Sequence, residues 1–132
     1  MAQDKLSCLY LTTYRQLGSQ PPWETTEKDL RLLKQRLKIN LPTDWPVRYR
    51  RCTLRDGSLG DCELIVSAGS KLPYFTIRVD KRLPRIAQWL VIAHEYAHCL
   101  QQRGPAGEST RLDDHDGEFA LAYTRVWQEI AE

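Results

Sequence analysis

The residues best able to do chemistry in this 132-residue chain lie in the segment His94-Glu95-Tyr96-Ala97-His98. On a helix, side chains four positions apart project from the same face, so both imidazoles can bind one metal ion. Glu95, next to the first histidine, can reach a water molecule on that ion and act as its general base. A bound zinc ion would acidify the water and stabilise the charge that develops on the scissile carbonyl. The pattern therefore predicts zinc-dependent hydrolysis of peptide bonds.

Two histidines do not complete a catalytic zinc site, so a third protein ligand is expected elsewhere in the chain. His115, the third and last histidine, lies 17 positions beyond His98 and is the first candidate. Glu118, one helical turn further along, is the main alternative. Four more acidic residues could bind the ion or orient the histidines: Glu108, Asp113, Asp114 and Asp116. An acidic side chain near a helix N-terminus is stabilising without any metal, which favours His115 over Glu118 as the ligand.

Two predicted helices must position these residues. Residues 85–102 are apolar almost all round, which is typical of a helix buried at the centre of a domain. Histidines and a glutamate are costly there unless something pairs with them. Residues 115–131 form the second helix, with Asp113 and Asp114 as capping residues at its N-terminal edge. A third helix, capped by a threonine at position 25 or 26, is predicted from leucines at helical spacing.

The middle of the chain changes from helical spacing to alternation of apolar and polar residues. This alternation predicts three strands, at about residues 47–50, 62–66 and 75–80. Turn residues at 56–60 favour an antiparallel meander of these strands. Cys52 and Cys62 would then face each other across the first hairpin, as reduced core residues in a cytosolic protein. A partial apolar stripe also predicts a helix at residues 3–17.

These elements together predict one α+β domain spanning residues 1–132, because the chain is long enough for one core and too short for two. In this domain a small three-stranded antiparallel sheet packs on the active-site helix and its flanking helices. The start of the chain has no apolar run typical of a secretory signal. The longest apolar stretch, Trp89 to Ala93, is too short to span a bilayer. We therefore expect a soluble, cytoplasmic protein with no membrane partner.

The order of the motifs resembles that of the SprT-like zinc peptidases, which pair a His-Glu-x-x-His helix with a distal His-Gly-Pro-x-Phe type segment. Here the distal segment reads His115-Asp116-Gly117-Glu118-Phe119, with aspartate and glycine in place of the glycine and the proline. The resemblance covers about residues 75–130. Metzincins would instead need a glycine at Gln101, and thermolysin-like gluzincins an aspartate at Ala122.

The resemblance implies a minimal zincin-like fold in which His94, His98 and His115 bind zinc and Glu95 is the catalytic base. It also implies intracellular proteolysis and, in some members, action on DNA-bound proteins. Zincins commonly hold a peptide substrate as an added strand at the edge of the sheet. Residues 75–80 are the edge strand expected here, with a protein or peptide as the substrate.

The distribution of charge adds nucleic acid as a second class of partner. Residues 1–60 hold 11 Lys and Arg against 6 Asp and Glu, whereas the remainder of the chain is acidic. A basic surface could bind nucleic acid, or it could be an ordinary solvated face. The basic residues concerned are Arg31, Lys34, Arg36, Lys38, Arg48, Arg50, Arg51 and Arg55.

Two alternatives to an active peptidase stay open from the residues alone. The first is a non-catalytic, zinc-stabilised binding module, which would usually fill all four zinc positions with protein ligands, often cysteines. The four cysteines of this chain form no Cys-x-x-Cys pair, which argues against that alternative. The second is a latent or toxin-type peptidase whose site is blocked by its own N-terminal segment.

Overall fold

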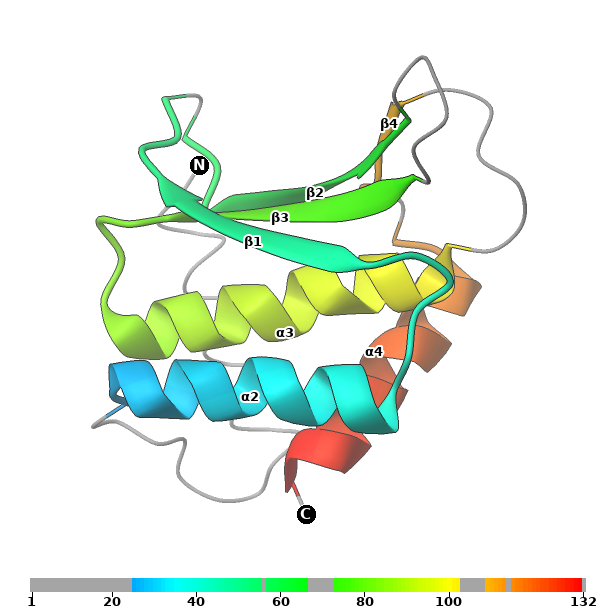
Figure 1. Ribbon diagram of the computed structural model, residues 1–132, viewed down its shortest axis with the longest axis horizontal. Helices are drawn as coiled ribbons and strands as arrows, with labels where there is room; N and C mark the ends of the chain where they lie inside the picture. Colours follow the sequence, from blue (N-terminus) through cyan, green and yellow to red (C-terminus); the bar gives the residue numbers. More distant parts are fainter. Residues whose placement is uncertain (1–24, 56, 67–72, 103–108, 114, 132) are drawn as a thin grey trace.

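A four-stranded sheet lies across three helices in the described part of the protein (Figure 1). The structure is a computed structural model that describes residues 25–55, 57–66, 73–102, 109–113 and 115–131. Its elements in chain order are α2 (Glu27–Asn40), β1 (Val47–Cys52), β2 (Gly60–Ile65), β3 (Tyr74–Asp80), α3 (Arg85–Gln101), β4 (Thr110–Arg111) and α4 (Gly117–Ala131). This arrangement confirms the predicted α+β class. The helix predicted at 3–17 lies outside the described residues.

The sheet is mixed, with the strand order β1-β3-β2-β4. β3 pairs in parallel with β1, where Tyr49 lies opposite Ile77, and antiparallel with β2, where Cys62 lies opposite the same residue. The two-residue β4 extends the sheet beyond β2. The prediction of a three-stranded antiparallel meander is therefore wrong in strand number and order. The predicted edge strand, β3, is a central strand.

The burial of β3 explains why it lies between β1 and β2. Phe75, Ile77 and Val79 are almost wholly buried and alternate with partly exposed residues, so one face of β3 packs on α3. A strand that carries the largest apolar side chains is best protected from water when a strand lies on each side. β1, by contrast, exposes Arg48 and Arg50, and charged side chains are a common protection of sheet edges.

α3 is the central helix of the described structure, as its apolar composition predicts. It packs against the sheet on one side and against α2 and α4 on others, and most of its residues are buried (Figure 1). Burial on several sides explains why it lacks the single apolar stripe of a surface helix. No described helix, α3 included, combines the length and apolarity needed to cross a membrane.

α2 begins and ends with specific hydrogen bonds. Thr26 and Asp29 form a reciprocal capping box, which confirms the predicted threonine cap. At the other end, the Tyr96 hydroxyl of α3 contacts the carbonyl oxygens of Leu37 and Leu41, at 3.1 Å and 2.6 Å. The Leu37 carbonyl already accepts a hydrogen bond from the Leu41 amide at 2.9 Å, so the shorter contact, to the Leu41 carbonyl, is the one that pairs an otherwise free group. Together the two contacts fix the end of α2 against α3.

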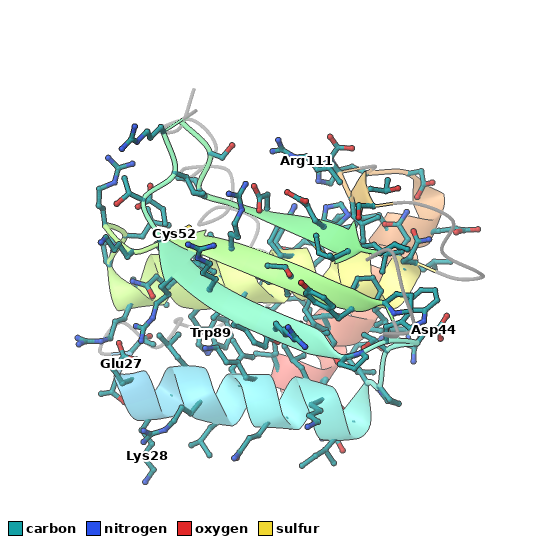
Figure 2. All side chains as sticks on the ribbon, turned by 45° about the horizontal axis from the view of Figure 1, so that its top comes forward. Glu27, Lys28, Asp44, Cys52, Trp89 and Arg111 are labelled. Carbon is teal, nitrogen blue, oxygen red and sulfur yellow. The ribbon has the colours of Figure 1, made fainter. Side chains whose placement is uncertain are left out.

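The cysteines are not arranged as predicted. Cys52 lies on β1 (Figure 2), and β3 separates it from Cys62 on β2, so the two do not face each other. Instead, the sulfur of Cys62 lies 3.2 Å from that of Cys99 on α3, and both side chains are buried. The hydrogen bond with Cys99, together with burial, raises the pKa of the Cys62 thiol far above its usual range. Both are free, buried thiols in the core, and the raised pKa makes the Cys62 thiol unreactive.

Candidate metal centre

The three histidines of the chain meet where the C-terminal half of α3 passes the start of α4. One ring nitrogen from each of His94, His98 and His115 lies within 4.8 Å of the other two. The Nε2 atoms of His94 and His115 are 3.1 Å apart. The centroids of the three rings are separated by 5.3, 4.9 and 5.1 Å. Residues distant in the sequence thus form one compact cluster of nitrogen donors.

Helical spacing and a short connection place these rings. His94 and His98 lie one turn apart on α3, as predicted. His115 lies between β4 and α4, because α4 begins at Gly117 and not at residue 115. The capping residue of α4 is Asp116, whose Oδ1 accepts a hydrogen bond from the Phe119 amide at 3.0 Å. The prediction of capping by Asp113 and Asp114 is therefore wrong for Asp113, and residue 114 lies outside the described residues.

Burial keeps two of the three imidazoles neutral. It lowers the pKa of His94 to about 3, and the nearby His98 and His115 lower it further in the same direction. Burial likewise lowers the pKa of His98 to about 4, with a second contribution from His115. Neutral imidazole is the form that binds metal ions, because its second nitrogen keeps a free lone pair. Both rings are therefore in the metal-binding state at neutral pH.

The cluster fits a tetrahedral zinc ion. Zinc–nitrogen bonds of about 2.0–2.1 Å in tetrahedral geometry place neighbouring ligand atoms about 3.3 Å apart. The 3.1 Å between the Nε2 atoms of His94 and His115 is close to that spacing. In addition, Nδ1 of His98 is buried without a hydrogen-bond partner among the described residues. Three imidazole donors would occupy three positions of a tetrahedral zinc ion and leave the fourth for water or substrate.

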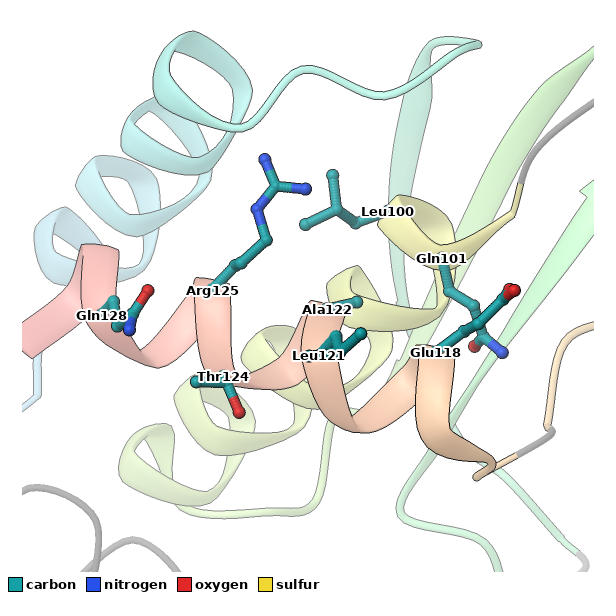
Figure 3. A pocket seen from close by; sticks show the side chains of 8 residues that line it. All are labelled: Leu100, Gln101, Glu118, Leu121, Ala122, Thr124, Arg125 and Gln128. Atoms are coloured by element: carbon teal, nitrogen blue, oxygen red, sulfur yellow. The ribbon is translucent and has the colours of Figure 1, made fainter.

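The acidic alternatives to His115 do not join the cluster. Among the described residues, the metal-binding group contains only the three histidines, so it excludes Asp113, Asp116 and Glu118. Glu118 instead lines a pocket of about 480 Å³ beside the end of α3, together with Leu100 and Leu121 (Figure 3). Glu108 lies outside the described residues, as does residue 114.

Phe119 forms an apolar wall against the histidines. Its ring centroid lies 5.1 Å from that of His94, 4.3 Å from that of His98 and 4.7 Å from that of His115. The side chain is buried and stacks on Tyr123. It can exclude water from one side of the cluster, which strengthens electrostatic interactions there. Phe119 was not among the predicted site residues, although the distal segment of the resemblance ends on it.

Glu95 and Tyr123 lie near the first histidine. Glu95 is buried on α3, 8% exposed. The Tyr123 ring contacts that of His94 at 5.4 Å. Burial raises the pKa of the Tyr123 hydroxyl, and the negative charge of Glu95 contributes to the rise. The charge of Glu95 also contributes to the raised pKa of the Cys62 thiol on β2, so the carboxylate acts on groups of both α4 and the sheet.

Seven of the eight predicted basic residues lie on α2 and β1, and Arg55 lies just beyond the end of β1. Arg51 forms an ion pair with Glu27 at 2.6 Å. Arg36 pairs with Glu129 at 3.0 Å, and the Lys34 ammonium lies 4.7 Å from the centre of a tyrosine ring. The Arg48 guanidinium lies 4.0 Å from the centre of the Tyr74 ring. Four of the eight basic side chains thus have partners among the described residues, which leaves a smaller basic surface than the sequence suggests.

Comparison of the chain with protein-family models, curated proteins and solved structures finds no match in any of the three.

Proposed function

We propose that this protein is a zinc-dependent metallopeptidase with an SprT-like, minimal zincin arrangement. The observation that carries the proposal is the convergence of His94, His98 and His115, with nitrogens within 4.8 Å and two rings kept neutral by burial. Glu95 adds a carboxylate next to the first of these ligands. A structural histidine cluster without metal would not need an adjacent buried carboxylate on the same helix turn.

In this proposal the three histidines hold the zinc ion and Glu95 moves the proton. The zinc ion supplies Lewis acidity toward a bound water and toward the scissile carbonyl. The Glu95 carboxylate accepts the proton of the attacking water and then transfers it to the departing amine. Phe119 keeps solvent from one side of the ligands. The substrate is a peptide or protein.

The arrangement favours a catalytic over a purely structural zinc site. Structural zinc ions usually have four protein ligands, often cysteines. In the described residues the cluster offers three histidines, while Cys62 and Cys99 contact each other outside it. An unfilled fourth position is what a catalytic site requires. Blocking of the site by the N-terminal segment would involve residues outside those described.

The test of the proposal is metal content combined with a substitution of the base. Protein purified without chelator is expected to contain one zinc ion per chain by elemental analysis, and H94A is expected to contain almost none. E95Q should keep zinc and fold but lose hydrolysis of an unfolded protein substrate such as casein, because an amide cannot accept the proton. E118Q makes the same chemical change outside the cluster and should remain active.

Two results would contradict the proposal. If the wild-type protein contains no zinc and is no more stable than H94A, the three histidines do not form a metal site. Unchanged hydrolysis by E95Q would remove Glu95 from the mechanism. Zinc binding without hydrolysis of any tested peptide would favour the binding-module alternative over the peptidase.

A further inference from the structure

The third histidine is held differently from the other two. His94 and His98 take their positions from the rigid backbone of α3. His115 is exposed and lies in the connection between β4 and α4, so its position depends on how the two ends of that connection are fixed. A metal ligand must be held to within about half an ångström of its working geometry. Any group that fixes this connection therefore affects the metal site.

The upstream end of the connection is fixed to the sheet. Thr110 and Arg111 of β4 pair with β2, and the Leu112 amide donates to the Cys62 carbonyl at 2.8 Å. Ser109 adds contacts to the backbone of Val66 at 2.9 Å and 3.2 Å. These bonds end three residues before His115. They fix where the connection starts.

The downstream end is fixed by one carboxylate oxygen. Oδ1 of Asp116 accepts a hydrogen bond from Nε2 of Gln101 at 2.9 Å and one from the Phe119 amide at 3.0 Å. Gln101 is the last residue of α3, and Phe119 lies in the first turn of α4. The same oxygen thus joins the helix that carries two of the histidines to the helix that follows the third.

We propose that Asp116 and Gln101 form a tether that positions His115 toward His94 and His98, with Asp116 as a positioning residue. The inference rests on the proposed zinc site. His115 is covalently adjacent to Asp116, so movement of the tether moves the imidazole directly. Asp116 occupies a position where the distal segment of the resemblance has glycine, which has no side chain to form such a tether. The tether is therefore a feature of this chain.

Three variants separate the tether from ordinary helix capping. D116N keeps an oxygen that can accept both hydrogen bonds and removes only the charge. D116S places serine, also a favoured capping residue, at the start of α4. The serine oxygen lies closer to the backbone than Oδ1 of aspartate, so it can still accept from the Phe119 amide but no longer reaches Nε2 of Gln101. Q101L removes the donor at similar volume. Because Gln101 also lies beside His98, D116S is the more specific of the two disruptive variants.

Zinc affinity, measured by competition with a chromophoric chelator, is the readout. D116S and Q101L should each weaken zinc binding by about tenfold, in the range known for partners that orient metal ligands. D116N should bind zinc like the wild type. The double variant D116S/Q101L should be no weaker than either single variant, because both remove the same bond. Cobalt(II) should show altered visible absorption in the same two variants and not in D116N.

The outcomes distinguish the tether from the site that it serves. Wild-type zinc affinity in D116S and Q101L would overturn the tether while leaving the zinc site in place. An equal loss of zinc affinity in D116N and D116S would also overturn the tether, because the charge of Asp116 and not its bond with Gln101 would then determine zinc binding. Absence of zinc binding in the wild type would instead overturn the proposed function, and the tether with it. Thermal unfolding of the metal-free variants is the control for folding.

Discussion

His115 and Glu118 lie three positions apart near the start of α4, and their surroundings differ completely. The Nε2 atom of His115 is 3.1 Å from that of His94, within the cluster of imidazole donors. Glu118 lines the pocket beside the end of α3 and does not belong to the cluster. We therefore expect substitutions of His115 and of Glu118 to affect metal binding differently, although the two residues lie in the same short segment of the sequence.

We expect H115A to weaken zinc binding by more than about 100-fold, the upper end of what the loss of an orienting partner costs. The physical reason is that two ligands remain where a stable site needs three. E118A should bind zinc within about threefold of the wild type, because its carboxylate lies elsewhere. Chelator competition on both variants measures the difference. Strong binding by H115A and weak binding by E118A would identify the glutamate as the third ligand.

The residues of the site differ in how far the sequence alone could identify them. The spacing of His94 and His98 needs only the geometry of one helix, so the sequence suffices to pair them. The third histidine could be named as the first candidate because it is the only other histidine of the chain, and the motif resemblance then supported it over Glu118; nothing local links it to α3. Asp116 was predicted only as one of four acidic residues that could bind the ion or orient the histidines, and Phe119 was given no role in the site. The contacts of both depend on how α4 packs against α3 and not on their own neighbours in the chain.

At the scale of elements, strand positions could be predicted and strand order could not. Alternation of apolar residues marks β1, β2 and β3 within the chain, because it reflects one buried face per strand. The order depends on which strand best covers α3, and that is a property of the packed core. The turn-like residues between β1 and β2 indicated a hairpin, but β3 takes the place between them.

The contact between β2 and α3 offers a test of this packing at Gly60. A Cβ atom on Gly60 would lie 2.4 Å from Cγ1 of Val91 and 2.7 Å from the carbonyl oxygen of Arg78. G60A should therefore lower the free energy of unfolding by about 1–3 kcal/mol, the usual cost of overfilling a packed core. Urea denaturation monitored by tryptophan fluorescence provides the measurement.

Gly117 is the matched control for Gly60. No atom lies within 4 Å of the position that its Cβ would take, and its φ is not positive. G117A should leave stability unchanged or raise it by about 0.4–1 kcal/mol, because alanine restricts the unfolded chain. Equal stability of G60A and wild type would show that β2 and α3 are not in close contact at Gly60.

At the scale of the whole molecule, the basic surface sets a limit on nucleic-acid binding. Arg48, Arg50 and Arg55 are exposed and form no ion pair with another described residue. Each phosphate contact contributes about −0.9 to the slope of log K against log salt for duplex DNA. We therefore expect any binding of duplex DNA through these three residues to be weak, with a slope no steeper than about −3.

Fluorescence anisotropy of labelled duplex DNA at several salt concentrations measures this slope, with R48A/R50A as the variant that should abolish binding. A much steeper slope, or binding unaffected by R48A/R50A, would place the contact elsewhere.

The two buried histidines make the stability of the metal-free protein sensitive to acid. The folded state holds the pKa of His94 at about 3 and that of His98 at about 4, against about 6.5 for histidine in an unfolded chain. Well above pH 6.5 both histidines are neutral in the folded and in the unfolded state, so they leave the free energy of unfolding unchanged. Below that pH the two histidines bind protons in the unfolded chain but stay unprotonated in the folded chain, so the free energy of unfolding falls as the pH falls. The upper limit is about 1.4 kcal/mol per pH unit for each histidine.

Denaturation of the chelator-treated protein between pH 7 and pH 4.5 tests this acid dependence. The stability should decline steadily below pH 6.5, and H94Q/H98Q should decline less, because glutamine does not titrate. The same slope in the double variant would show that other groups cause the loss. Excess zinc should move the onset of the decline to lower pH, because an ion bound only by the folded state adds stability and competes with protons for the same nitrogens. An onset that zinc does not move would mean that the histidines titrate independently of any metal, and it would count against the cluster as a zinc site.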